Sequence, residues 1–147
     1  MSVKIRAIAG AVTAAGVVLL TGSPASAHAY DHEDPYRTGC NTTARAVRTA
    51  SIESRVDGTV GTIKLMWSSG CRTNWTEIWT GASMRGTISV TTDRGGDRFT
   101  FRAGNGGHHW GNMMYAPGVC AWGSASVQWG SGAGGQNGSG TTGRACG

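Results

Sequence analysis

A shortage of aliphatic side chains limits what this chain can fold into. From residue 28 onward it has one leucine (Leu65), four isoleucines, six valines and two phenylalanines. These 13 residues are about 11% of a 120-residue segment, against ~20% or more in ordinary globular domains. Disorder would follow if the net charge were also high, but 11 Lys and Arg against 8 Asp and Glu give only +3. Six tryptophans can supply the missing apolar surface, because each buries far more area than a valine.

The first 27 residues have the organisation of a secretory signal peptide. A basic start is followed by an apolar run at residues 7–20 and then by the Ala-x-Ala pattern Ala25-Ser26-Ala27. Residues 27–29 form a second such pattern, so we expect cleavage after Ala27 or after Ala29. The apolar run is too short for a stable spanning helix. The sequence therefore predicts a secreted, extracellular protein with no membrane span in the mature chain.

Four cysteines remain after the expected cleavage, and they are Cys40, Cys71, Cys120 and Cys146. An even number in an exported chain predicts two disulfide bonds. Three pairings are open at this stage. We favour Cys40–Cys71 with Cys120–Cys146, because sequential pairing links each half of the chain locally. A zinc site is rejected, because no C-x-x-C spacing occurs.

Alternating apolar and polar residues predict short β-strands. In residues 59–69, Ile63, Leu65 and Trp67 point to one face, while Gly61 breaks the phase with Val60 and indicates a bulge. Residues 93–97 are expected to form a hairpin loop, and residues 44–56 fit either a short helix or a strand. Six or seven short strands predict an all-β fold, a small antiparallel β-sandwich or a partly open barrel, held by disulfides.

We expect one folded domain. Residues 28–39 are polar and contain Pro35 and Gly39, which predicts an extended N-terminal arm. Residues 40–147 are predicted to form the β domain. Within it, residues 130–143 contain seven glycines and are predicted to be a flexible loop whose far end is tied back by Cys146.

Tryptophans offer the most direct route to a binding function. Trp75 and Trp79 share a strand face with Glu77, and the charged neighbour indicates that this face is partly wet. Arg72, Trp75 and Trp79 are therefore candidate ligand-binding residues that would stack on sugar rings or on a partner's apolar surface. The alternative, favoured in a chain so poor in leucine, is that these tryptophans fill the core.

Histidines raise the question of metal binding. Cleavage after Ala27 would place the amine and imidazole of His28 together, and cleavage after Ala29 would place His32 third, a pattern that suits Cu(II) or Ni(II). We favour the simpler interpretation that polar residues follow a cleavage site, and we expect no metal and no cofactor. His108 and His109 point to opposite faces of a strand, so a functional role for them requires Glu77, Asp93 or Asp97 nearby.

Three motifs carry a resemblance to a known family. They are Tyr30-Asp31-x-x-Asp34-Pro35-Tyr36-x-Thr38-Gly39-Cys40, Ser69-Gly70-Cys71-Arg72-Thr73-Asn74-Trp75 and Trp110-Gly111-Asn112-Met113-x-Tyr115-Ala116-Pro117-Gly118. With these motifs the chain resembles the YjfA family, which consists of small exported proteins of Gram-positive bacteria. The resemblance implies a secreted or surface-displayed β domain of unknown function and supplies no catalytic residues. His32 stands where glycine is commoner in that family.

Composition, motifs and resemblance together predict a secreted module that binds a cell-wall polymer, a glycan or another surface protein without chemistry of its own. Three arginines, Arg94, Arg98 and Arg102, would favour anionic polymers. No basic run is typical of nucleic-acid binding. The alternatives are a small secreted hydrolase or metal-dependent enzyme and a purely structural surface protein.

Overall fold

The chain folds into an antiparallel β-structure. A computed structural model describes residues 28–147, and the predicted signal peptide at residues 1–27 lies outside the described residues. No helix in this part of the chain is long and apolar enough to cross a membrane. Its elements are η1 (Cys40–Thr43), β1 (Ala44–Ser54), β2 (Gly58–Ser68), β3 (Thr73–Thr80), β4 (Arg85–Thr92), β5 (Gly95–Phe101), η2 (Asn105–Gly107), β6 (His108–Trp110), β7 (Met114–Tyr115), β8 (Cys120–Gln128), β9 (Asn137–Thr141) and β10 (Ala145–Cys146).

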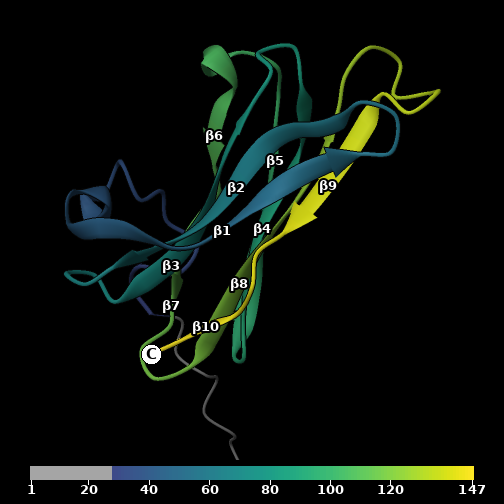
Figure 1. The fold of residues 1–147 in the computed structure, drawn as a ribbon. Helices are drawn as coiled ribbons and strands as arrows, with labels where there is room; N and C mark the ends of the chain where they lie inside the picture. Colours follow the sequence, from purple (N-terminus) through teal and green to yellow (C-terminus); the bar gives the residue numbers. More distant parts are fainter. Residues whose placement is uncertain (1–27) are drawn as a thin grey trace, which may run out of the picture.

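All ten strands of the described residues belong to one sheet. Its main path runs β5-β4-β8-β9-β1-β2-β3-β6, with β10 paired to β8 and β7 paired to β3. The sheet curls so that the β1–β2 pair lies over β4 and β8 (Figure 1). The end strands β5 and β6 meet through the rings of Phe101 and His109, whose centroids are 4.4 Å apart. The result is a nearly closed antiparallel barrel, which confirms the predicted all-β class with more strands than the six or seven expected.

The predicted alternation in β2 is present. Ile63 and Leu65 are completely buried, whereas Trp67 is half-buried because it lines a cavity of about 110 Å³. Gly61 pairs with Ile52 and Thr59 pairs with Glu53, so the residue between them is unpaired. That residue is Val60, which confirms the predicted bulge.

Other segments differ from the sequence predictions. Residues 28–39 form successive turns that pack on the barrel instead of an extended arm. The hairpin between β4 and β5 turns through two residues only, because Thr92 pairs with Gly95. The glycine-rich segment contains β9, which pairs with β8. Glycine is required there because a Cβ at Gly140 would lie 2.4 Å from the backbone oxygen of Ser51.

Small residues on β8 explain how so few aliphatic side chains fill the barrel. Ala121, Gly123 and Ala125 alternate along its buried face. A Cβ at Gly123 would lie 2.5 Å from the hydroxyl oxygen of Thr76 on β3, so the two walls approach too closely for a larger residue. The narrow interior is filled by Ile52, Ile63, Leu65, Ile78, Ile88, Val90, Phe101 and Val127.

A second apolar cluster lies on the opposite face of β3. Because side chains alternate along a strand, Trp75 points away from the face that carries Ile78. Trp75 packs there with Cys40 and Met113 and is completely buried. The turns of residues 28–43 therefore cover an apolar face that would otherwise meet solvent.

Both predicted disulfides are present. Cys40–Cys71 joins η1 to the β2–β3 turn, and Cys120–Cys146 joins the paired strands β8 and β10. They close loops with sequence separations of 31 and 26 residues. Loops of this length contribute roughly 3–4 kcal/mol each in the chain-entropy model.

The two disulfides differ in exposure, and we expect them to be reduced in sequence. Cys40 is 1% exposed, whereas Cys146 is exposed, so an external thiolate reaches the second bridge more easily. Brief treatment with dithiothreitol, followed by alkylation and peptide mass analysis, should label Cys120 and Cys146 first. Equal labelling of all four cysteines at early times would contradict this expectation.

Candidate functional site

A buried carboxylate organises the outer face of β3. Glu77 is 2% exposed. Its Oε1 accepts hydrogen bonds from the indole nitrogen of Trp75 at 2.8 Å and from the phenol of Tyr36 at 3.0 Å. Its Oε2 lies 2.9 Å from Nε2 of His108, whose ring donates to it. These three donors come from β3, the N-terminal arm and β6, so one carboxylate holds three segments together.

Four rings lie over this carboxylate, and we call them the aromatic strip: Tyr36, Trp79, His108 and Trp110. Trp79 and His108 are stacked with centroids 4.5 Å apart, and Tyr36 and Trp110 have centroids 4.4 Å apart. Tyr36 is 39% exposed and Trp79 is 36% exposed. Lys64 lies at the Trp79 end, with its ammonium 4.4 Å from the ring centroid. The strip is thus a partly exposed aromatic surface in which Tyr36 and His108 are held by hydrogen bonds to Glu77.

The chemistry of Tyr36 follows from its position. Burial of the phenol and then the negative charge of Glu77 raise the pKa of Tyr36 to about 12. The phenol therefore stays protonated at neutral pH and remains a hydrogen-bond donor to Glu77. Its ring is held in one orientation, as a stacking surface requires.

The N-terminal arm is built to position Tyr36. Asp34 accepts hydrogen bonds from the backbone nitrogens of Tyr36 and Arg37 at 2.8 and 3.1 Å, and from the indole of Trp110 at 3.2 Å. Asp31 accepts from the backbone nitrogen of Tyr115 at 2.6 Å. Two carboxylates of the first family motif thus fasten the arm to the segment that carries the third motif.

His32 has a backbone φ of 65°, in the left-handed region that favours glycine. This accounts for glycine being commoner at this position in the family that the chain resembles. The imidazole contacts the barrel, with Nδ1 2.6 Å from a carboxylate oxygen of Asp97 on β5.

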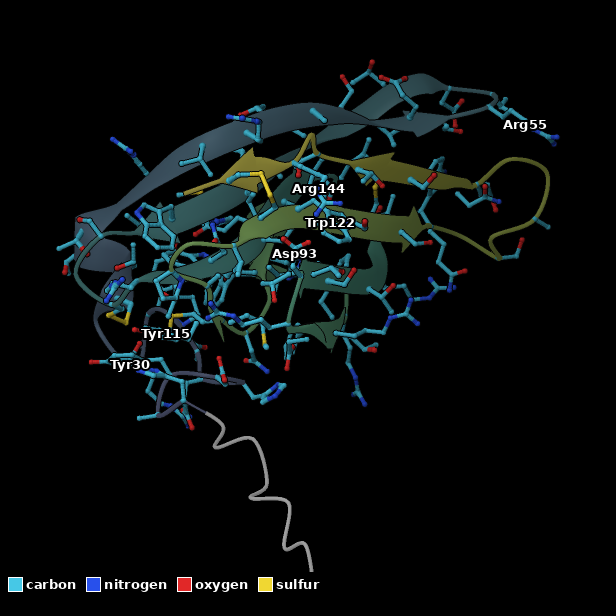
Figure 2. The ribbon with its side chains drawn as sticks, turned by 90° about the horizontal axis from the view of Figure 1, so that it is seen from below. Tyr30, Arg55, Asp93, Tyr115, Trp122 and Arg144 are labelled. Atoms are coloured by element: carbon cyan, nitrogen blue, oxygen red, sulfur yellow. A yellow bond between two sulfur atoms is a disulfide. The ribbon has the colours of Figure 1, made fainter. Side chains whose placement is uncertain are left out.

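The other histidine considered as a metal ligand, His28, stacks on Tyr115 with centroids 3.5 Å apart and lies 5.6 Å from the ring centroid of Tyr30. Figure 2 shows Tyr30 and Tyr115 in the same region of the molecule. Within residues 28–147, no group of three or more His, Cys, Asp or Glu side chains is arranged to hold a metal ion.

The structure does not bring the three predicted ligand-binding residues together. Trp79 is on the surface, but Trp75 is completely buried, so the favoured interpretation that tryptophans fill the core is correct for Trp75 and the wet face is wrong for it. The error arose because Glu77 was interpreted as a solvated neighbour, whereas its charge is buried and hydrogen-bonded. Arg72 lies beside Tyr115, 5.9 Å from its ring centroid, and takes no part in the strip.

Sequence analysis missed Tyr36 and Trp110 as surface residues. The available signal was the His108-His109-Trp110 run, for which a functional role required Glu77, Asp93 or Asp97 nearby. Glu77 does contact His108. As predicted for neighbours on a strand, His109 points the other way, into contact with Phe101.

A separate cation–aromatic cluster forms around Arg144. Arg144 pairs with Asp93 and places its guanidinium 4.5 Å from the ring centroid of Trp122 (Figure 2). This cluster stands beside the Cys120–Cys146 disulfide, because the backbone nitrogen of Cys120 also donates to Asp93 at 3.0 Å. Its charges are paired within the fold, which favours a structural role.

Fold and site together define a small disulfide-linked β-barrel domain with an exposed aromatic surface. The family described as "Protein of unknown function (DUF2690)" matches residues 28–126, and the chain belongs to that family. It is 31% identical over 64 residues to "Uncharacterized protein YjfA" of Bacillus subtilis (strain 168), a match over 42% of this chain and 41% of that protein. The chain thus spans about two fifths of that relative's length. No solved structure matches. The predicted resemblance is confirmed.

Replacing Glu77 should destabilise the whole outer face. We expect Glu77→Gln to lower the free energy of unfolding by about 1–3 kcal/mol, because an amide nitrogen replaces one carboxylate oxygen, so the charge-assisted bond to His108 is lost and that ring must change tautomer to pair. Urea unfolding followed by tryptophan fluorescence measures the loss. Glu53→Gln is the matched control, because Glu53 is exposed and bonds only Thr59. Equal effects of the two substitutions would contradict a central role for Glu77.

Acid should destabilise the fold through His109. Burial, and then the neighbouring His108, lower the pKa of His109 below 6.5. The unfolded chain then binds a proton at this histidine more readily than the folded one. The contribution of neutral His109 to the free energy of unfolding is therefore complete above about pH 6.5 and is lost as the pH falls. His109→Phe removes the titrating group beside Phe101 and should flatten the fall in stability between about pH 7 and pH 5. Unfolding curves at both pH values check this, and parallel pH profiles would contradict it.

Proposed function

We propose that the protein is a secreted, non-catalytic module that binds a cell-wall polymer or glycan through the aromatic strip. One observation carries the proposal. Of the four exposed large hydrophobic side chains in the described residues, Tyr36, Trp79 and Phe99 lie at one site, and Val56 is the exception. Phe99 joins the group because it lines the same cavity as Trp110. Exposed apolar residues that cluster in this way mark binding surfaces.

The geometry favours a ligand with flat, weakly polar faces. Sugar rings have such faces, and aromatic side chains stack on them without needing charge. Tyr36 and His108 are hydrogen-bonded to Glu77, so their rings do not have to be ordered when a ligand binds. A surface already fixed in this way loses little conformational entropy on binding.

Electrostatics support attraction to an anionic envelope polymer. The described residues carry a formal net charge of +3, with 11 basic and 8 acidic side chains. Lys64 lies at one end of the strip, above Trp79. Long-range attraction would concentrate the polymer near the protein, and the rings would then make the close contacts.

Secretion is part of the proposal and rests on the leader sequence. Two formed disulfides are compatible with an oxidising compartment outside the cytoplasm. His28 stacks on Tyr115, and its backbone nitrogen lies 2.9 Å from a carboxylate oxygen of Asp31. These contacts support cleavage after Ala27, because cleavage after Ala29 would remove them.

The His108–Glu77 pair supports a second candidate function, that of a small hydrolase. An imidazole held by a carboxylate is the usual arrangement of a general base. We place this function second, because among the described residues no hydroxyl or thiol is hydrogen-bonded to His108. A water molecule would have to act as the nucleophile.

Removing the Trp79 ring should weaken retention on cell walls about tenfold. We expect the wild-type protein to sediment with purified insoluble walls of Gram-positive bacteria. The amount of Trp79→Ala left in the supernatant should be about tenfold that of the wild type, because the exposed ring is the contact surface. Val56→Ala is the control, because it removes exposed apolar area elsewhere. Circular dichroism confirms that both variants are folded.

Other results of the same experiment would contradict the binding proposal. A wild-type protein that stays in solution would favour a structural surface protein. Release of soluble wall fragments that is lost in His108→Ala would favour the hydrolase.

A further inference from the structure

We propose that the cavity between β5 and β6 is a subsite for one uncharged sugar ring. This inference rests on the proposed function and specifies which part of a glycan the protein holds most closely. The cavity has a volume of about 190 Å³ and is lined by Asp34, Phe99, Asn105, His109, Trp110 and Asn112. It lies beside the aromatic strip, because Trp110 belongs to both and contacts Tyr36 at 4.4 Å. A polymer lying on the strip could therefore place one ring in the cavity.

Size limits what the cavity can hold. Sites for drug-sized ligands typically measure about 300–1,000 Å³, and this cavity is smaller. A single ring fits such a volume better than a peptide or a large aromatic compound. The rest of the ligand must then lie outside, which is where the strip offers stacking surfaces.

The lining combines apolar rings with amides. Phe99, on the edge strand β5, is 39% exposed and presents part of its ring to the cavity. Asn112 is half-buried and its amide makes no hydrogen bond to another described residue. Asn105 uses its amide nitrogen on the backbone oxygen of His108 at 2.6 Å, leaving its side-chain oxygen as an acceptor. A sugar ring has C–H faces that pack on aromatic rings and hydroxyl groups that hydrogen-bond to amides, and this lining offers both.

Charge excludes acidic sugars from the cavity. No lysine or arginine lines it. The one carboxylate, that of Asp34, accepts three N–H donors from neutral groups, so it is hydrogen-bonded within the protein but keeps its negative charge. An anionic sugar would meet this carboxylate with no lysine or arginine to offset it, whereas hydroxyl and acetamido groups can bond the free amides.

Tryptophan fluorescence titrations with three tetrasaccharides test the subsite. The probes are β-1,4-linked glucose, β-1,4-linked N-acetylglucosamine and α-1,4-linked galacturonic acid. We expect the wild-type protein to bind at least one neutral tetramer, and to bind the acidic tetramer more weakly. The comparison of the two neutral probes decides whether the amides recognise hydroxyl or acetamido groups, and either result supports the proposal.

Two variants remove the cavity's contacts and leave the strip intact. Phe99→Leu keeps an apolar side chain and loses the ring, and Asn112→Ala loses the unpaired amide. Each should weaken binding of the neutral tetramer about tenfold. Asn41→Ala is the control, because Asn41 is also half-buried without a side-chain hydrogen bond but does not line the cavity. Melting temperatures confirm that each variant is folded.

Failure of the subsite differs from failure of the binding function. If Phe99→Leu and Asn112→Ala bind the neutral tetramer as the wild type does while Trp79→Ala does not, the subsite proposal is contradicted. Binding through the strip is still supported. If the wild type sediments with cell walls but binds no neutral tetramer, or prefers the acidic one, the subsite is also overturned. If Trp79→Ala binds both walls and tetramers like the wild type, the proposed function itself fails.

Discussion

The buried Glu77 carboxylate is the interaction on which the outer half of the structure depends. A carboxylate removed from water costs several kcal/mol unless its oxygens are hydrogen-bonded. Glu77 meets that requirement with donors from Tyr36, Trp75 and His108. Each donor belongs to a different part of the chain, so the arm, β3 and β6 must all be in place before the charge is compensated. The same bonds then hold the rings above it.

Two thin apolar layers replace the single aliphatic core that this composition cannot build. Inside the barrel, the small residues of β8 bring the walls together until a few isoleucines fill the space. Outside it, the arm covers Trp75 and Met113. The Cys40–Cys71 disulfide closes this outer layer, because Cys40 lies within it. Glycines therefore allow the barrel walls to approach closely, and tryptophans supply the apolar area that the few aliphatic side chains cannot.

Sequence patterns predicted what depends on neighbours along the chain. Alternation located β2, the phase break located its bulge at Val60, and sequential pairing gave both disulfides. The burial of Glu77 was not predictable, because the donors that compensate its charge include an arm residue 41 positions earlier in the sequence. Periodicity treats Glu77 as an exposed charge, since it carries no information on distant donors. β9 was missed for a similar reason, because glycines form a strand there only when β1 and β8 are already beside it.

The hydrogen bonds that stabilise the outer face also hold the rings of the proposed binding surface, and this constrains how such a surface can bind a ligand. The phenol of Tyr36 and one nitrogen of His108 point inward to Glu77, and Trp79 covers one face of His108, so the exposed ring faces are those of Tyr36 and Trp79. A ligand that stacks on those faces leaves every buried bond intact, so binding requires no opening of the fold. A ligand that needed the polar atoms of these residues would have to break the compensation of a buried charge, at a cost of several kcal/mol. Under the proposed function, the arrangement therefore favours ligands that bind through the exposed ring faces over those that need the carboxylate.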